Sequence, residues 1–225
     1  MGPEMVGSQP DPVPPRPGAS RATHVDLTDA EILRRGLEAF SELGYEGASV
    51  RELAKRLGVN HNFINDRFGS KNNFWRAVVD HAMGAMQSRF SLAFELGSDD
   101  YEKLEAVIKA FYSVAANAPQ MNRILAAEFV LDSDRLDYIF DKYTTAMLER
   151  VEPIAQRLMD AGRMPRISMD ILFTALSGPA LALTQGGLAR RLGRAPDQSA
   201  AEWQRATDSL AEVVLRGLLP AEPTA

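Results

Sequence analysis

A cluster of short polar side chains between residues 61 and 66 could form hydrogen bonds with the edges of DNA bases. This polar cluster consists of His61, Asn62, Asn65 and Asp66, and the aromatic ring of Phe63 lies among them. Imidazole, amide and carboxylate groups pair with bases in the major groove, where each base pair presents its own pattern of donors and acceptors. The chemistry that this spacing favours is recognition of a base sequence, provided that one exposed face carries the cluster.

Two short helices joined by a tight turn are predicted to carry the polar cluster. Ser49 followed by Glu52 is a capping box, so the first helix should begin directly after Ser49. Gly58 lies where that helix must end, because glycine adopts a left-handed backbone that costs other residues roughly 1 kcal/mol. Asn60 is a good N-cap for the second helix. Residues 49–71 are therefore predicted to form a helix-turn-helix unit.

The second helix of this unit is predicted to be amphipathic. Ile64 and Phe68 are four residues apart and share one face with Val59, which turns all three toward a core. The polar cluster occupies the opposite face. Five Lys and Arg residues against two Asp and Glu residues make the stretch from Arg51 to Lys71 locally basic, and that sign suits contacts with phosphate groups.

The segments SVRELAKRLGV, NHNFINDR and FGSK are similar to the TetR family of bacterial transcriptional regulators. The usual pattern of that family is a capped helix, the letters lGV, a short recognition helix and F.sK, and the similarity runs from about Ile32 to Val79. The resemblance implies a three-helix DNA-binding head. By this resemblance, Ser49 corresponds to the family's N-cap hydroxyl, and Lys71 corresponds to the family's lysine that contacts the DNA backbone. The residues that we expect to contact DNA are Ser49, Arg51, Asn60, His61, Asn62, Phe63, Asn65, Asp66 and Lys71.

Two positions of the recognition helix depart from the family pattern. The family commonly has an aromatic residue at the position of Asn65 and a histidine or similar residue at Asp66, and both contact the DNA backbone there. A carboxylate at Asp66 would repel phosphate. Either Asp66 accepts a hydrogen bond from a cytosine amino group, or it pairs with a neighbouring Arg or Lys on the surface.

Length and composition limit the class of protein. The 225 residues are 45% hydrophobic, which is enough for a packed core. Cysteine is absent, which excludes disulfides, thiolate nucleophiles and cysteine metal sites. The N-terminus lacks the apolar core of a signal peptide, and no run approaches the ~18 apolar residues of a membrane span, so we expect a cytoplasmic protein. The net charge of −5 suits a regulator with one small basic surface better than a protein that coats nucleic acid.

The chain is predicted to have three parts and an all-α fold of about nine helices. Residues 1–22 form a Pro/Gly-rich leader that we expect to be disordered, residues 23–72 the DNA-binding head, and residues 73–221 a helical regulatory and dimerisation body. No stretch alternates apolar and polar residues for long enough to indicate a strand. Within the body, Pro153 is expected to kink a long helix over residues 133–161.

The last two long helices, which follow Ser168 and Ser199, are the expected interface of a homodimer. The resembled family pairs two copies through these helices as a four-helix bundle. Small residues that would let the helices approach closely are Ala175, Gly178, Ala182 and Ala211. The basic, glycine-bearing stretch between the two helices, residues 186–197, is interpreted as a solvated loop rather than as a second nucleic-acid patch.

A cavity for a small-molecule effector is expected among the middle helices, with Asn117 or Gln185 as polar points. In the resembled family the long helix that follows the head couples ligand binding to the spacing of two DNA heads. Each side chain assigned to the cavity is, taken singly, more often part of a packed core than of a ligand site. The side chains predicted to line the cavity are Phe111, Tyr112, Asn117, Met121, Phe129, Tyr143, Met147 and Phe173.

Three classes of function are weighed. The first is a dimeric repressor that a small molecule releases from palindromic DNA. The second is an enzyme, but the sequence has no phosphate loop, no G-x-G-x-x-G, no H-E-x-x-H and no G-x-S-x-G, and its three histidines are scattered. We therefore expect no catalytic site, no metal and no cofactor. The third is an all-helical ligand or protein interaction module with lost or altered DNA binding, and Asn65 and Asp66 are its only support.

Overall fold

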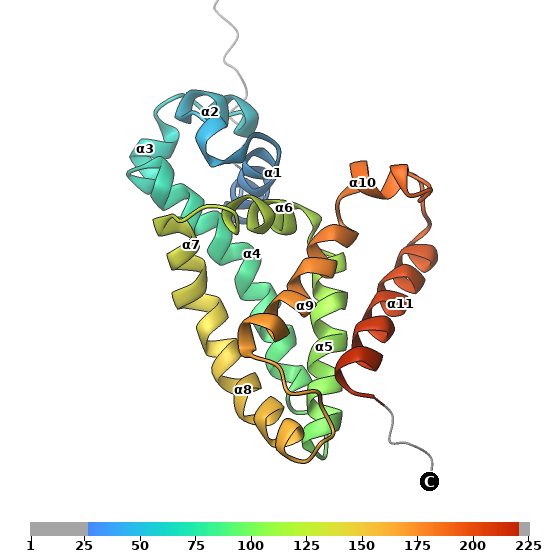
Figure 1. The fold of residues 1–225 in the computed structure, drawn as a ribbon. Helices are drawn as coiled ribbons and strands as arrows, with labels where there is room; N and C mark the ends of the chain where they lie inside the picture. The colour runs from blue at the N-terminus through green and yellow to red at the C-terminus, as the bar shows by residue number, and fades with distance from the viewer. Residues whose placement is uncertain (1–26, 221–225) are drawn as a thin grey trace, which may run out of the picture.

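The structure, a computed structural model, describes residues 27–220, and every regular element in this range is a helix (Figure 1). The all-α fold class is confirmed. α10 is the helix that the sequence did not predict, because residues 186–197 were expected to form a loop. The leader predicted for residues 1–22 lies outside the described range. In chain order the elements are α1 (Asp29–Gly47), α2 (Val50–Leu57), α3 (Phe63–Phe68), α4 (Lys71–Ala93), α5 (Asp100–Ala116), α6 (Pro119–Glu128), α7 (Asp134–Ile139), η1 (Phe140–Thr144), α8 (Thr145–Asp160), α9 (Met169–Leu183), α10 (Gly186–Arg191) and α11 (Ala200–Leu218).

Side-chain caps and a glycine set the limits of the first two helices. Oγ1 of Thr28 accepts a hydrogen bond from the backbone N–H of Glu31 at 3.3 Å. Oγ of Ser49 accepts one from the backbone N–H of Glu52 at 3.1 Å. Gly58 has a φ of +73°, so it ends α2 in the left-handed conformation that the sequence predicts.

α3 begins later than the sequence predicts. Oδ1 of Asn60 accepts a hydrogen bond from the backbone N–H of Asn62 at 2.9 Å, and the backbone N–H of Phe63 donates to the carbonyl oxygen of Asn60 at 3.2 Å. An asparagine side chain that bonds to the backbone two residues on forms an Asx turn. Asn60 therefore caps a turn that leads into α3 (Phe63–Phe68) rather than α3 itself.

One hydrophobic cluster joins the head to the start of α4 and to α6, α7 and η1. Leu53 of α2 and Ile64 of α3 are fully buried in the same cluster as Phe74 and Trp75 of α4. The side chains that the body adds to this cluster are Met121, Ile124, Ile139 and Tyr143. The core is thus continuous across the boundary predicted at residue 72, and a movement of α4 must move the packing of the head.

A π-helical segment lies within the long helix predicted over residues 133–161. α7, η1 and α8 follow one another without a break, and Phe140–Thr144 make up the π-helical part. Such single-turn segments are frequent at functional sites because they shift the side chains that follow. α8 continues through Pro153, and α9 continues through Pro179. Neither proline ends its helix.

The body packs around α5. This helix contacts α4, α8, α9 and α11, and a second hydrophobic cluster fills the space between them. In Figure 1 the head lies at one end of α4, and α5, α8, α9 and α11 extend away from it. Within residues 27–220, no helix combines the length and the apolar character that crossing a membrane requires.

Candidate functional site

The polar cluster lies on the exposed side of α3 and of the turn before it. All four of its members are exposed, whereas Ile64, which lies between them in the sequence, is fully buried. Phe63 is half-buried, and its ring meets that of Phe68 edge to face at 6.5 Å between centroids. The four polar side chains predicted to contact bases therefore share an accessible face, and Phe63 is turned partly toward the core.

The carboxylate of Asp66 forms no hydrogen bond or ion pair with another residue in the described part of the chain. Its neighbour Arg67 pairs with Asp29 at the start of α1, with 2.5 Å between Nη2 and Oδ1. The surface ion pair considered for Asp66 is therefore not formed with Arg67. The carboxylate is open to accept a hydrogen bond from a cytosine amino group.

Lys71 is engaged within the protein. Its Nζ donates to the carbonyl oxygen of Tyr45 at 3.0 Å and lies 4.1 Å from the centre of the Tyr45 ring. Arg135 of α7 lies 4.0 Å from the centre of the same ring. Two cations thus contact Tyr45 and connect the head to the body. Ser49 and Arg51 are exposed, and Ser49 acts as the cap of α2.

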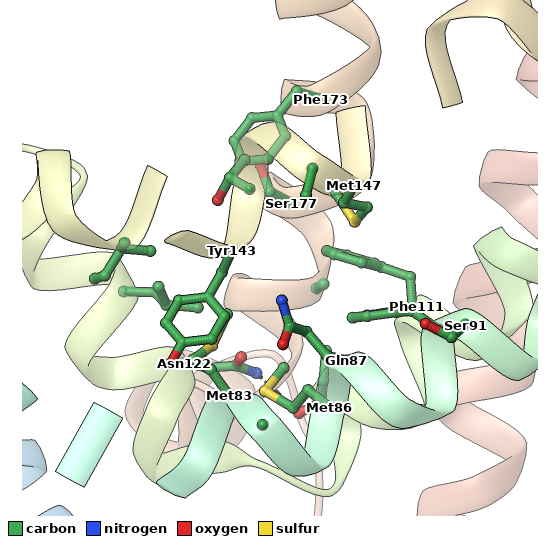
Figure 2. A pocket seen from close by; sticks show the side chains of 18 of the residues that line it. Met83, Met86, Gln87, Ser91, Phe111, Asn122, Tyr143, Met147, Phe173 and Ser177 are labelled. Atoms are coloured by element: carbon green, nitrogen blue, oxygen red, sulfur yellow. Dashed lines mark hydrogen bonds between the residues drawn. The ribbon is translucent and has the colours of Figure 1, made fainter. Parts of the chain in front are cut away.

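A cavity of about 550 Å³ lies in the body between α4, α5, α6, η1, α8 and α9 (Figure 2). Figure 2 shows side chains from these elements around a common space. Five of the eight residues predicted to line a ligand cavity do line it. They are Phe111, Phe129, Tyr143, Met147 and Phe173.

The other three predicted residues lie elsewhere. Tyr112 is fully buried in the body core, where burial raises the pKa of its hydroxyl to about 12. Met121 is fully buried in the cluster shared with the head, and Asn117 is exposed at the end of α5. Gln185 is also exposed, just before α10. The sequence misplaced residues such as Tyr112 because adjacent residues point about 100° apart around a helix, so that neighbours face different surroundings.

α4 contributes a wall that the sequence did not predict. Met83, Met86, Gln87 and Phe90 line the cavity, although the sequence suggested only a long amphipathic coupling helix. A signal was present: between residues 83 and 91, methionine, glutamine and serine replace the bulky aliphatic residues expected of a closely packed helix face. Flexible methionines are common on surfaces that adapt to a ligand.

Three buried polar residues also line the cavity: Asn122 of α6, Thr144 of η1 and Ser177 of α9. Nδ2 of Asn122 donates to the carbonyl oxygen of Ala115 at 2.9 Å and to Oγ1 of Thr184 at 3.3 Å. Asn122 is thereby held in place, with its amide oxygen left unpaired.

Among the described residues 27–220, Arg150 is the one charged residue that lines the cavity. Its guanidinium lies over the ring of Phe94, at 3.9 Å from the centre. The carboxylate of Glu95 is 3.6 Å away, and Glu95 is largely exposed. The lining contains no acidic residue, so the cavity has a positive electrostatic bias.

Tyr143 connects the cavity to α4. Its hydroxyl donates a hydrogen bond to Oδ1 of Asp80, which also accepts from the hydroxyl of Tyr138 at 2.6 Å. Nζ of Lys142 lies 2.9 Å from Oδ2 of Asp80. Partial burial acts against ionisation of Asp80, but hydrogen bonds from the two tyrosines and the lysine outweigh it and lower the pKa of the carboxyl. These four residues are called the Asp80 cluster below.

Comparison with known proteins agrees with the geometry of the head. Residues 32–78 match the family described as bacterial regulatory proteins, tetR family. Over 157 residues the chain is 29% identical to an HTH-type transcriptional repressor of Mycobacterium tuberculosis, a match that covers 70% of each protein. Over 168 residues it is 26% identical to the HTH-type transcriptional regulator UidR of Escherichia coli, which covers 74% of this chain and 83% of UidR.

Solved structures share the fold. A ketosteroid transcriptional regulator of Mycobacterium tuberculosis has a TM-score of 0.65 at 16% identity, over 85% of this chain and 94% of that one. The regulator FadR of Bacillus subtilis, in complex with stearoyl-CoA, has a TM-score of 0.61 at 17% identity, over 84% of this chain and 98% of that one. The matched family and the sequence relatives are regulators, not enzymes. The head is of the tetR type, and the chain is a DNA-binding transcriptional regulator.

Proposed function

We propose that the chain is a dimeric repressor that a small molecule in the cavity releases from a palindromic operator. One observation carries the ligand-responsive part: Tyr143 is both a wall of the cavity and a hydrogen-bond partner of Asp80 on α4. The start of α4 shares its hydrophobic cluster with the head. A ligand that displaces Tyr143 therefore acts on the helix that carries the DNA-reading surface.

Release requires a difference in affinity between two states. Two heads on a two-fold axis would bind half-sites one helical turn of DNA apart, or a multiple of it. A ligand that prefers a different position of α4 weakens DNA binding by the ratio of its affinities for the two positions, and DNA weakens ligand binding by the same factor. The Asp80 cluster offers two such states, with its hydrogen bonds made or broken.

The dimer is proposed to form through α9 and α11, as predicted from the sequence. Ile171 on α9 and Val213 on α11 are 52% and 69% exposed, although both are large and apolar. Gly178 and Ala182 are also exposed on α9, where they would permit close approach of a second copy. Ala211 is buried within its own protomer, so its small size serves packing inside the body.

The relatives support this proposal by their names. The Mycobacterium tuberculosis relative is a transcriptional repressor, and the FadR structure holds stearoyl-CoA. The first is consistent with repression in this chain. The second is consistent with a body of this fold that holds a small molecule.

The test is selection of the purified chain on random duplex DNA, followed by titration of the selected site at several salt concentrations. We expect a two-fold symmetric site, binding by a dimer, and an affinity that falls steeply with salt. A target gene placed under this site should be expressed more strongly when the regulator is deleted. An asymmetric site bound by one chain, or lower expression after deletion, would contradict the proposal.

Variants of the polar cluster sharpen the test. Asn65→Ala should lose about 1 to 3 kcal/mol of preference at one position of each half-site. Asp66→Ala should lose preference for a cytosine if the carboxylate reads that base, and should strengthen binding to all sequences equally if it only repels phosphate. Asn117→Ala, an exposed asparagine of the body, is the matched control and should leave the preference unchanged.

A further inference from the structure

The cavity is long and mostly apolar. Met83 of α4 and Phe94, the residue directly after α4, both line it, and a step of eleven positions along a helix corresponds to about 16 Å. Apolar side chains, five phenylalanines and three methionines among them, supply most of the wall. An elongated, mainly apolar molecule fits this shape better than a compact polar one.

Polar groups without partners lie deep in this wall. Asn122, Thr144 and Ser177 are only 3%, 8% and 8% exposed. Oδ1 of Asn122 and the hydroxyls of Thr144 and Ser177 form no hydrogen bond with another described residue. All three residues line the cavity, and their oxygens are accessible from it, so a ligand can take the place of water as their hydrogen-bond partner. The oxygen of Asn122 can only accept, so its partner must donate a hydrogen.

The charged end of the cavity lies elsewhere, at its mouth. Gln87, Ser88 and Ser91 of α4 and Arg150 of α8 are exposed lining residues, which places the opening between these two helices. Arg150 follows Thr144 by six residues, about 9 Å along the helix. Its pairing with Glu95, at 3.6 Å and largely exposed, is weak and leaves guanidinium N–H groups for another anion.

We propose that the cavity binds an elongated apolar monoanion with a hydroxyl group at the end opposite its carboxylate. The hydroxyl lies deep, donating to Oδ1 of Asn122 and accepting from the hydroxyl of Ser177. The carboxylate stays at the mouth with Arg150, where it keeps part of its hydration and avoids the large cost of burying a charge. The lining has no acidic residue, so a cation of the same shape finds no countercharge. This inference rests on the proposed function only in treating the cavity as a ligand site.

The test is calorimetric titration of the full chain, without DNA, with four probes of one chain length. These are ω-hydroxydodecanoate, dodecanoate, dodecanediol and dodecylammonium, each below the concentration at which it aggregates. We expect one ω-hydroxydodecanoate to bind per chain. Dodecanoate and dodecanediol should each bind about tenfold more weakly, because each lacks one of the two polar contacts. Dodecylammonium should bind most weakly.

Variants assign each contact. Arg150→Met should weaken ω-hydroxydodecanoate about tenfold and leave dodecanediol unchanged, while Arg150→Lys should keep the preference for the acid. Ser177→Ala should weaken ω-hydroxydodecanoate by about threefold to tenfold and leave dodecanoate unchanged. Arg123→Met and Ser209→Ala, exposed on α6 and α11, are the matched controls. Circular dichroism of each variant checks that it is folded.

The outcomes separate this inference from the proposed function. Equal binding of all four probes, tightest binding of dodecylammonium, no binding of any probe, or an unchanged ranking in Arg150→Met and Ser177→Ala would overturn the ligand class. Operator binding would stand in each case. If ω-hydroxydodecanoate binds as expected but leaves the complex with the selected operator intact, the ligand class holds and ligand-controlled release fails.

Discussion

The ring of Tyr143 forms part of the cavity wall, and its hydroxyl donates a hydrogen bond to Asp80 on α4. The π-helical segment η1 contains Tyr143 and therefore sets its position relative to α7 and α8. One side chain thus contacts both the space for a ligand and the helix that enters the core of the head. This relationship predicts that a residue of the body, far from the polar cluster, affects DNA binding.

Tyr143→Phe should alter operator affinity while leaving the shape of the cavity intact. The variant removes one donor to Asp80, so we expect a loss of about 1 kcal/mol in the free energy of unfolding and a change of several-fold in the operator dissociation constant. Tyr101→Phe is the control, because the Tyr101 hydroxyl donates to the carbonyl oxygen of Leu219 at 3.2 Å, away from α4. Urea denaturation and operator titration measure both effects. A similar change of operator affinity in the two variants would count against a specific role for Tyr143.

The Asp80 cluster should make part of the stability depend on pH. Partial burial opposes ionisation of Asp80, but hydrogen bonds from Tyr138, Tyr143 and Lys142 lower its pKa below the ordinary carboxyl value. A lowered folded-state pKa means that the charged group stabilises the fold above the ordinary carboxyl pKa, and that this contribution is lost as pH falls through the lowered value. The difference in Tm between the chain and Asp80→Asn should therefore shrink toward acid pH.

Other carboxyls with a lowered pKa, such as those of Glu31 and Asp100, are common to both proteins and cancel in this comparison. At the alkaline end, burial and the hydrogen bond to Asp80 raise the pKa of Tyr143. The neutral hydroxyl is thus favoured in the folded state, and its contribution persists up to the ordinary tyrosine pKa and is lost only as pH rises through the raised value. A difference in Tm that stays constant from neutral to acid pH would refute the role assigned to Asp80.

Gly36 holds α1 close to α4. A Cβ at this position would lie 2.6 Å from Cζ of Phe74 and 2.7 Å from Cγ2 of Val78, and both side chains are fully buried. Overpacking costs about 1 to 3 kcal/mol, whereas alanine gains about 1 kcal/mol over glycine in a helix. Gly36→Ala should therefore lower the free energy of unfolding, measured in urea. Gly84→Ala is the control: a Cβ there would meet no atom within 4 Å, so this variant should raise the free energy of unfolding slightly. A higher free energy of unfolding in both variants would show that α1 can move away from α4.

The sequence predicted those features that depend on nearby residues. The cap at Ser49 and the stop at Gly58 are determined within one helical turn, and both are formed. The capping box is only half formed, because the Glu52 carboxylate bonds to Arg56 and the backbone N–H of Ser49 donates to Gly47. The start of α3 was misplaced because Asn60 had two local partners to choose from, and the Asx turn prevailed over a direct cap. α10 was missed because a six-residue helix has too short a pattern to distinguish it from a loop.

The cavity was only partly predictable because it depends on how distant helices pack. Phe111 and Tyr112 are adjacent aromatic residues, yet Phe111 lines the cavity and Tyr112 lies in the core. The apolar periodicity of the sequence places both residues on a buried face of the helix. It does not distinguish a face that lines a cavity from a face that packs in the core. The polar residues Asn122 and Ser177 gave no signal in the sequence, because their meaning appears only when α6 and α9 meet at one cavity.

The face formed by α9 and α11 should control dimerisation. Val213 is 69% exposed on α11, and a two-fold interface would bring this surface against the same surface of a second copy. Val213→Asp would bury an unpaired charge there, which should raise the dimer dissociation constant about a hundredfold, or about 3 kcal/mol, in sedimentation equilibrium. Val130→Asp is the control, because Val130 is 80% exposed beyond the end of α6 and outside the proposed interface. If only Val130→Asp dissociates the dimer, the two copies associate through another face. That other face would then set the spacing of the two DNA-binding heads and of the operator half-sites.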